Sequence, residues 1–351
     1  MFTLLTSFTE GGDVRKVLLK SAVVMMWSAL AMASDTAPLK LVQSVDLPKY
    51  SGDFDHFAAD VQGNRLFLAA EDHGTLEVFD LNTNKWLKTI KGFDVPHSIL
   101  YLPTSKKLFV TDGGDSMSKV LNAADLRVLQ KVPLVPGADS LAYDAAAHRA
   151  YVVTGGKDVK MKESVVSAID TSDFSKKADL KLDSAHVEAM ALESKGNRLF
   201  INVTDQNQIY VVDRSDMKVL DRWPLQNAGE NSPMVFDQDS HRLFIVCRKP
   251  AKLVVFDTDS GKQVGAWDTA ARSDGMAFDP VKKRIYVPGG EGYIAVYQQK
   301  DADHYDLIAK VPSAPGAKTC LLVPELNRLY VAVSPGEGKF GGRVLAFETL
   351  P

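Results

Sequence analysis

The chain has 351 residues, the length of one large or two medium domains. Hydrophobic residues make up 45% of it and charged residues 24%, a globular composition that excludes a disordered or collagen-like protein. The formal net charge of −3 excludes the overall basic character of a dedicated nucleic-acid-binding domain. Two cysteines, Cys247 and Cys320, provide neither a disulfide framework nor a haem-attachment motif.

The N-terminal region carries the features of a secretory signal peptide in their usual order. Within residues 14–33, three basic residues precede the apolar stretch 22–31, and the small-residue motif Ala31-Met32-Ala33 follows. The apolar stretch is shorter than the roughly 20 residues of a membrane-spanning helix. We therefore expect residues 1–33 to be a signal peptide, with 1–13 as a surplus extension, and the mature protein to be periplasmic or secreted.

From residue 34 onward, one pattern repeats seven times. Each copy has a basic residue, an aliphatic or small residue, an aromatic residue, and then a β-branched or aliphatic one. Successive basic residues are 42 to 49 positions apart, which is typical of propeller blades. The seven basic residues are Arg65, Lys107, Arg149, Arg198, Arg242, Arg284 and Arg328.

Within each copy, short apolar runs separated by polar turns indicate four β-strands. Runs such as 253–256 are apolar on both faces because each blade packs between two neighbours. The seventh copy lacks a fourth strand, while a lone strand at 39–47 precedes the first copy. We therefore predict that residues 34–351 form a single all-β domain. Its fold is a seven-bladed β-propeller with four strands per blade, in which the N-terminal strand closes blade seven.

The repeat resembles that of the YVTN-repeat, YncE-like family of seven-bladed propellers. The resemblance rests on the aromatic second strand and on aspartate-rich hairpins such as 257–262 (DTDSGK) in blades one, four and five. The signature tetrapeptide departs from the family pattern, whose asparagine is missing from its place. Its seven copies read FLAA, FVTD, YVVT, FINV, FIVC, YVPG and YVAV. The resemblance implies a propeller fold, export and no assigned catalysis.

Candidate ligand-binding residues precede the innermost strands. In a propeller these loops converge around the central channel, where loops on a rigid scaffold commonly bind ligands. Ten positions before the basic residue, six of the seven copies carry an ionisable side chain. Such a ring favours a cation, water or a basic group as ligand, although these residue types also cap exposed turns. The seven positions are Asp55, His97, Asp139, Glu188, Ser232, Asp274 and Lys318.

Histidines on the same face suggest a divalent metal. Asp55, His56, His97 and Glu188 offer the nitrogen and oxygen atoms that such metals prefer. Neither HxH nor HExxH spacing is present, so the metal would need side chains from separate loops. No other cofactor is assigned.

The opposite sector of this face is basic. It includes Arg248, Arg272 and Lys318, which could bind a carboxylate, a phosphate or a polyanion. A solvated rim is the alternative interpretation.

The sequence favours binding over catalysis. The first hypothesis is an exported, non-catalytic propeller that binds an as yet unknown protein, polymer or small anionic ligand at the channel-mouth face. The alternative is a metal-assisted hydrolase or lactonase with a cation at the central channel. A quinone-dependent dehydrogenase ranks third, because Trp86, Trp223 and Trp267 fall on predicted outermost strands.

Overall fold

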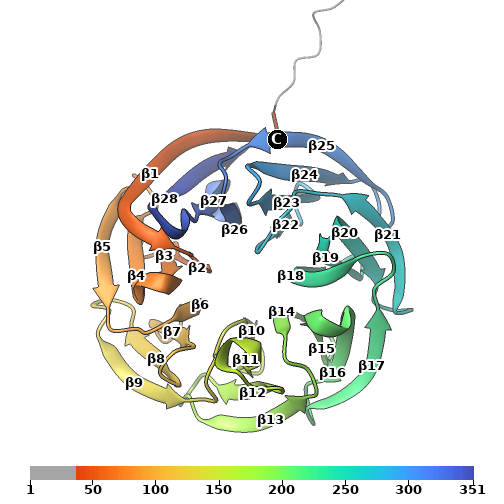
Figure 1. Ribbon diagram of the computed structural model, residues 1–351, viewed down its shortest axis with the longest axis horizontal. Helices are drawn as coiled ribbons and strands as arrows, with labels where there is room; N and C mark the ends of the chain where they lie inside the picture. The colour runs from red at the N-terminus through yellow and green to blue at the C-terminus, as the bar shows by residue number, and fades with distance from the viewer. Residues whose placement is uncertain (1–36) are drawn as a thin grey trace, which may run out of the picture. The chain divides into compact units, whose positions relative to one another are not determined.

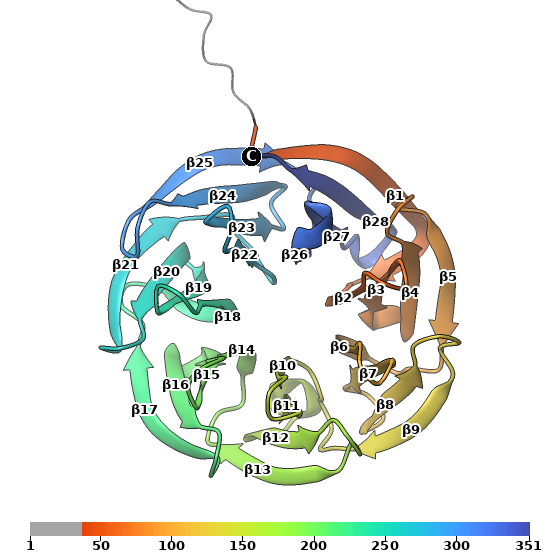
Figure 2. The ribbon, with the colours of Figure 1, turned by 180° about the vertical axis from the view of Figure 1, so that it is seen from behind.

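Seven antiparallel sheets of four strands surround a central axis, as Figures 1 and 2 show from opposite sides. The structure, a computed structural model, describes residues 37–351. Within each of blades one to six, the strands follow chain order from the channel to the rim. The predicted seven-bladed propeller with four strands per blade is therefore confirmed. The predicted signal peptide lies outside the described residues.

The first three blades occupy residues 57–182. Blade one comprises β2 (Phe57–Asp60), β3 (Arg65–Ala70), β4 (Thr75–Asp80) and β5 (Trp86–Lys91). Blade two comprises β6 (Pro96–Leu102), β7 (Lys107–Asp112), β8 (Met117–Asn122) and β9 (Val128–Pro133). Blade three comprises β10 (Leu141–Asp144), β11 (Arg149–Gly155), β12 (Ser164–Asp170) and β13 (Lys176–Leu182).

The next three blades occupy residues 187–312. Blade four comprises β14 (Val187–Leu192), β15 (Arg198–Val203), β16 (Gln208–Asp213) and β17 (Lys218–Pro224). Blade five comprises β18 (Gly229–Asp237), β19 (Arg242–Lys249), β20 (Ala251–Asp257) and β21 (Lys262–Asp268). Blade six comprises β22 (Ala277–Asp279), β23 (Arg284–Gly289), β24 (Tyr293–Gln299) and β25 (Tyr305–Pro312). Short 3-10 turns are η1 (Glu71–His73), η2 (Lys157–Val159), η3 (Thr204–Gln206) and η4 (Pro324–Leu326).

Blade seven combines the two ends of the described chain. It contains β26 (Ala317–Val323), β27 (Arg328–Val333), β28 (Gly336–Thr349) and, as its outer strand, β1 (Leu39–Gly52). The antiparallel register of β1 and β28 pairs Leu39 with Thr349 and Leu47 with Gly342. The predicted closure of blade seven is confirmed, although β1 continues to Gly52 beyond a register shift that follows Leu47.

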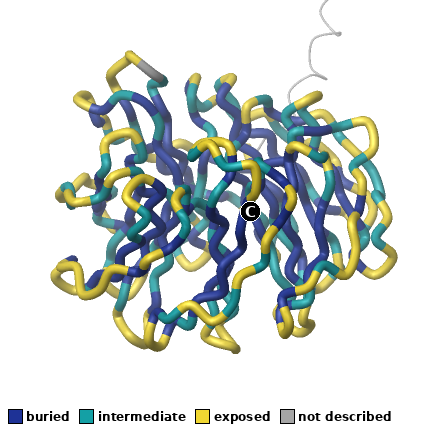
Figure 3. Tube along the Cα trace, turned by 60° about the horizontal axis from the view of Figure 1, so that its bottom comes forward, coloured by how far each residue is buried: buried dark blue, intermediate teal, exposed yellow. Residues whose placement is uncertain are grey.

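The core consists of side chains packed between neighbouring blades. The aromatic residue of every repeat is almost fully buried, as for Phe67 and Phe244 at 0% exposure and Tyr330 at 2%. Burying one such side chain contributes roughly 1.5–3 kcal/mol. Figure 3 shows this burial along the strands and exposure in the turns. The repeated tetrapeptide is therefore the packing unit of the fold.

In four of the repeats, those with Arg65, Arg198, Arg242 and Arg284, the basic residue hydrogen-bonds to the next blade on the face away from the channel mouth. Arg65 of blade one donates to the carbonyl of Ala123 in blade two. Arg198 of blade four likewise reaches the carbonyl of Thr258 in blade five. Among residues 37–351, no helix is long and apolar enough to cross a membrane.

Candidate functional site

One cavity of about 250 Å³ lies at the channel mouth, the end of the channel where the chain enters each innermost strand. All seven positions predicted from the repeat line this channel-mouth cavity, one from each blade. They are Asp55, His97, Asp139, Glu188, Ser232, Asp274 and Lys318. Arg248, at the end of β19, lines the same cavity, whereas Arg272 lines an adjoining pocket. Ligand binding by these residues stays a prediction.

On one side of the cavity, Asp55 lies among histidines. Its side chain is 2.7 Å from Nδ1 of His97 and 3.5 Å from Nε2 of His56. Burial favours the neutral form of Asp55, but the charges of His56 and His97 outweigh it and hold its pKa well below the usual range. Burial also opposes the charged form of His97, yet Asp139 and Asp55 raise its pKa to about 10. The structure therefore holds His97 as a cation between two carboxyl groups.

Two further carboxyl groups in this cluster titrate near neutrality. Burial and the charge of Asp55 raise the pKa of Glu71 to about 7. Burial likewise raises the pKa of Asp139 to about 7; the charge of His97 opposes this shift, and the negative charges of Asp55 and Glu188 add to it. Burial is the largest cause of both pKa shifts, and neighbouring negative charge adds to it; such crowding of carboxylates favours a bound cation.

Glu71 is a site residue that the repeat spacing missed. It opens η1, in the turn between the second and third strands of blade one. Other acidic residues missed by the spacing are Asp53, which precedes the innermost strand, and Asp158 in η2. The turns between the second and third strands of a blade, such as the one that carries Glu71, also lie at the channel mouth. Acidic residues in these turns were the sequence signal that could have identified Glu71. Their positions do not follow the repeat spacing.

The structure brings two sets of potential metal ligands together. Oxygen and nitrogen atoms of Asp55, Glu71 and His97 lie within 4.8 Å of one another, as do those of Asp55, His56 and Asp139. Three of the four metal ligands suggested by the sequence, Asp55, His56 and His97, therefore occur in these sets, but the two histidines belong to different ones. Neither set includes the fourth, Glu188.

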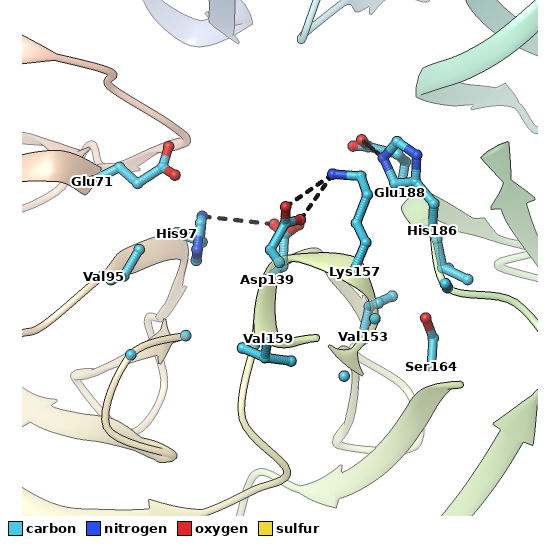
Figure 4. Close-up of a pocket in the computed structure, with 18 residues that line it drawn as sticks. Glu71, Val95, His97, Asp139, Val153, Lys157, Val159, Ser164, His186 and Glu188 are labelled. Carbon is cyan, nitrogen blue, oxygen red and sulfur yellow. Dashed lines mark hydrogen bonds and ion pairs between the residues drawn. The ribbon is translucent and has the colours of Figure 1, made fainter. Parts of the chain in front are cut away.

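Glu188 lies in a different part of the cavity. Its carboxylate is 2.7 Å from Nε2 of His186 and 3.9 Å from Nη1 of Arg248. Figure 4 shows Glu71, His97 and Asp139 on one side and Glu188 with His186 on the other. The extended blade-three turn, which carries Lys157, lies beside them. The residues that lie beside Asp55 are thus Glu71 and Asp139, and not the predicted Glu188.

Basic residues on the other side of the cavity are largely paired with carboxylates. Arg248 contacts Asp274, and Nζ of Lys318 lies 3.3 Å from Asp274 and 2.9 Å from Asp53. Burial would lower the pKa of Lys318, but these two carboxylates raise it above the usual range. Arg248 and Lys318 are therefore paired mainly with Asp274 and Asp53.

The charge balance of the whole cavity is negative. Seven carboxyl groups line it, against two permanently charged basic residues and two histidines. The carboxyl groups belong to Asp53, Asp55, Glu71, Asp139, Asp158, Glu188 and Asp274. A cation is thus the ligand that best complements this cavity electrostatically.

A glycine-lined recess of about 290 Å³ adjoins the cluster over blade three and shares Glu71, His97 and Asp139 with it (Figure 4). A Cβ at Gly113 would lie 3.1 Å from Nε2 of His97, and one at Gly137 only 2.8 Å from a backbone oxygen. Glycine at these positions therefore leaves room beside the histidine. The recess could hold an organic group next to a cation.

Fold and site together define a seven-bladed β-propeller with a charged, predominantly acidic channel mouth. No protein-family model matches the chain. Over 151 residues, or 42% of this chain, it is 29% identical to the uncharacterized protein YncE of Escherichia coli O157:H7. The identity to YncE of Escherichia coli strain K12 is 28% over the same length. The chain spans only about two fifths of these relatives. Together with the propeller fold, this similarity supports the resemblance to YncE-like propellers.

Similarity to solved structures concerns the fold alone. A chain of the hydrazine synthase of Kuenenia stuttgartiensis superposes with a TM-score of 0.69 at 15% identity, covering 79% of this chain and 91% of that one. A chain of a mitotic checkpoint complex superposes with a TM-score of 0.73 at 13% identity, covering 89% and 92%. At such low identities the activities of these assemblies do not transfer.

Proposed function

We propose that this protein is an exported, non-catalytic binding scaffold that holds a divalent metal ion at its channel mouth. One observation carries the proposal: Asp55 belongs to two compact ligand sets, in a cavity where carboxyl groups outnumber basic ones. A mixture of carboxylate and imidazole ligands suits zinc, manganese and iron(II). Binding would release the proton that His97 holds between Asp55 and Asp139, so the metal affinity should rise with pH. Asp55 is the shared ligand, and the blade scaffold orients it.

The test is metal titration of the full-length protein after removal of metal with EDTA. Isothermal titration calorimetry with ZnCl2 and with MnCl2 should show saturable binding near one ion per chain for at least one metal. We expect Asp55→Asn to weaken this binding at least tenfold, since it removes the shared ligand charge, and even the loss of a residue that only orients a metal ligand costs about 10–100-fold. Absence of saturable binding in the wild type would overturn the proposal.

A matched control exists on the opposite face. There Oδ1 of Asp259 lies 2.9 Å from Nδ1 of His241, an Asp–His pair like that of Asp55 and His97 but exposed. Asp259→Asn should leave the metal affinity unchanged. Equal weakening by Asp55→Asn and Asp259→Asn would show that the titration reports surface charge and not a channel-mouth site.

Export is the second part of the proposal, and it rests on the basic, apolar and small-residue order of residues 14–33. Expression of the full chain in a Gram-negative host should yield periplasmic or secreted protein whose N-terminal residue is Ser34. An unprocessed chain in the cytoplasm would contradict the proposed export, but it would not bear on the proposed metal site.

A metal-assisted hydrolase or lactonase is the second candidate function. The glycine-lined recess favours it, because it offers space for a substrate directly beside Asp139, Glu71 and His97. A metal held by Asp55 would lower the pKa of its bound water and supply the nucleophile. Metal-dependent hydrolysis of p-nitrophenyl acetate or γ-butyrolactone, lost in Asp55→Asn, would favour catalysis. Metal binding with no such turnover would favour the scaffold.

A further inference from the structure

A separate pocket of about 490 Å³ adjoins the channel mouth beside blades five, six and seven. We call it the basic pocket, because four cationic side chains line it together with a single carboxylate, Asp53. The cationic side chains are those of Arg248, Arg272, Lys318 and Lys339. The sign of its charge is thus opposite to that of the channel-mouth cavity.

Nearby carboxylates neutralise only part of this charge. Arg248 and Lys318 share Asp274, and Lys318 also contacts Asp53. Among the side chains that the structure describes, none of the ion pairs involves Arg272 or Lys339. Arg248 also lies 3.9 Å from Glu188, so three carboxylates offset Arg248 and Lys318, and the charges of Arg272 and Lys339 remain to attract an anion.

The position of Arg272 is fixed by contacts of both its backbone and its side chain. Its φ of +58° lies in the left-handed region, as do those of fifteen other non-glycine residues among those that the structure describes. Two hydrogen bonds link Arg272 to Gly290: the Gly290 amide donates to the Arg272 carbonyl over 3.2 Å, and the Arg272 guanidinium donates to the Gly290 carbonyl. The second bond holds the Arg272 guanidinium beside Gly290, which also lines the basic pocket.

We propose that the basic pocket binds a dianionic oxyanion, and that the phosphate group of a small phosphate monoester is its best match. Such a group carries a charge of about −1.5 to −2 near neutral pH, which matches the two cations, Arg272 and Lys339, that lie outside the pocket's ion pairs. Guanidinium and ammonium groups form strong charge-assisted hydrogen bonds to its oxygens. The proposal is independent of the metal site. The two sites adjoin, because Arg248 and Lys318 line both.

The test is titration of EDTA-treated full-length protein with inorganic phosphate by isothermal calorimetry at low ionic strength. The wild type should bind phosphate saturably, and Arg272→Gln should weaken the binding at least about tenfold, as expected for loss of one charge-assisted contact. Malonate, a dicarboxylate, should bind more weakly than phosphate. No saturable binding, equal binding by Arg272→Gln, or tighter binding of malonate would each overturn the proposal.

Two variants separate binding from folding. Arg272→Gly removes the charge but suits a positive φ, so its melting temperature should not fall while phosphate binding is lost. Lys339→Gln alters an exposed side chain and should weaken phosphate binding without affecting folding. Retained phosphate binding in both variants would contradict the proposal.

Arg127→Gln is the matched control, because Arg127 is 73% exposed and pairs with Asp125 on the opposite face. This variant should bind phosphate as the wild type does. The phosphate titration contains no metal, so it does not depend on the metal site. Phosphate binding can fail while zinc or manganese binding persists, and metal binding can fail while phosphate binding persists. The two proposals therefore stand or fall separately.

Discussion

At the residue scale, the basic residue that opens a repeat can form contacts both within its own blade and with the next blade. Arg198 donates from Nε to Oε1 of Glu193 over 2.9 Å within its own blade, and it also reaches the carbonyl of Thr258 in the next blade. Arg242 similarly contacts Asp303 of blade six at 2.9 Å. A guanidinium can make both kinds of contact because it has five donors in a planar arrangement. The repeat therefore encodes a connection between blades as well as a strand.

Arg198→Met should lower the free energy of unfolding by about 2 kcal/mol, because it removes charge-assisted hydrogen bonds and leaves Glu193 without its partner. Urea unfolding followed by circular dichroism measures this change. The control Arg127→Met alters a mostly exposed side chain and should change stability by about 0.5 kcal/mol or less. A similar effect of both variants would refute the role of Arg198 in coupling blades.

At the scale of elements, β1 closes the ring. It pairs with β28 and then leads into blade one, where Leu47 and Tyr50 join a core cluster shared by blades one and seven. The Tyr50 hydroxyl also lies 3.1 Å from Oγ1 of Thr89 on β5. The continuation of β1 to Gly52 thus attaches blade seven to both the inner core and the rim of blade one.

Leu47→Ala should destabilise the protein by roughly 2–5 kcal/mol, the range for a large-to-small change in a core, because Leu47 has no exposed surface. Leu41→Ala, in the same strand but at a side chain that is 51% exposed, should cost about 0.5 kcal/mol or less. Chemical denaturation of the two variants provides the comparison. If both were equally stable, β1 would not be part of the closing core.

At the scale of the whole molecule, the two faces of the propeller have different kinds of acidic residue. The channel mouth gathers carboxyl groups whose pKa values burial and crowding raise, as for Glu71 and Asp139. On the opposite face, aspartates in the hairpin turns accept hydrogen bonds that lower their pKa values. A backbone bond from Thr83 does this for Asp80, and a side-chain bond from Ser215 does it for Asp213.

These turn aspartates predict how stability depends on acid pH. Their folded pKa values lie below the unfolded value of about 3.9, so their contribution is fully present above that pH and is lost as the pH falls through the folded pKa. The melting-temperature difference between wild type and Asp213→Asn should be largest above about pH 5 and shrink toward about pH 2. Thermal scans across this range measure it. A difference that widened in acid would contradict the assignment.

Sequence reasoning reached the blade count and the ring of seven positions because one packing unit repeats at a nearly constant period. It did not find Glu71, which lies in an irregular turn, or the pairing of Glu188 with His186. It also ended the closing strand at residue 47, although β1 reaches Gly52. These features depend on contacts between residues with no fixed spacing in the chain.

By itself, the sequence determined the fold, because the periodic aromatic and aliphatic residues can be buried only when seven equivalent blades close into a ring. Only the tertiary structure decided which charged groups meet. It separated an acidic histidine cluster around Asp55 from a basic pocket around Arg272, although both lie at one end of the channel. The physical reason is that electrostatic interactions depend on distances of a few ångströms, and these are set by loops whose lengths and turns differ from blade to blade.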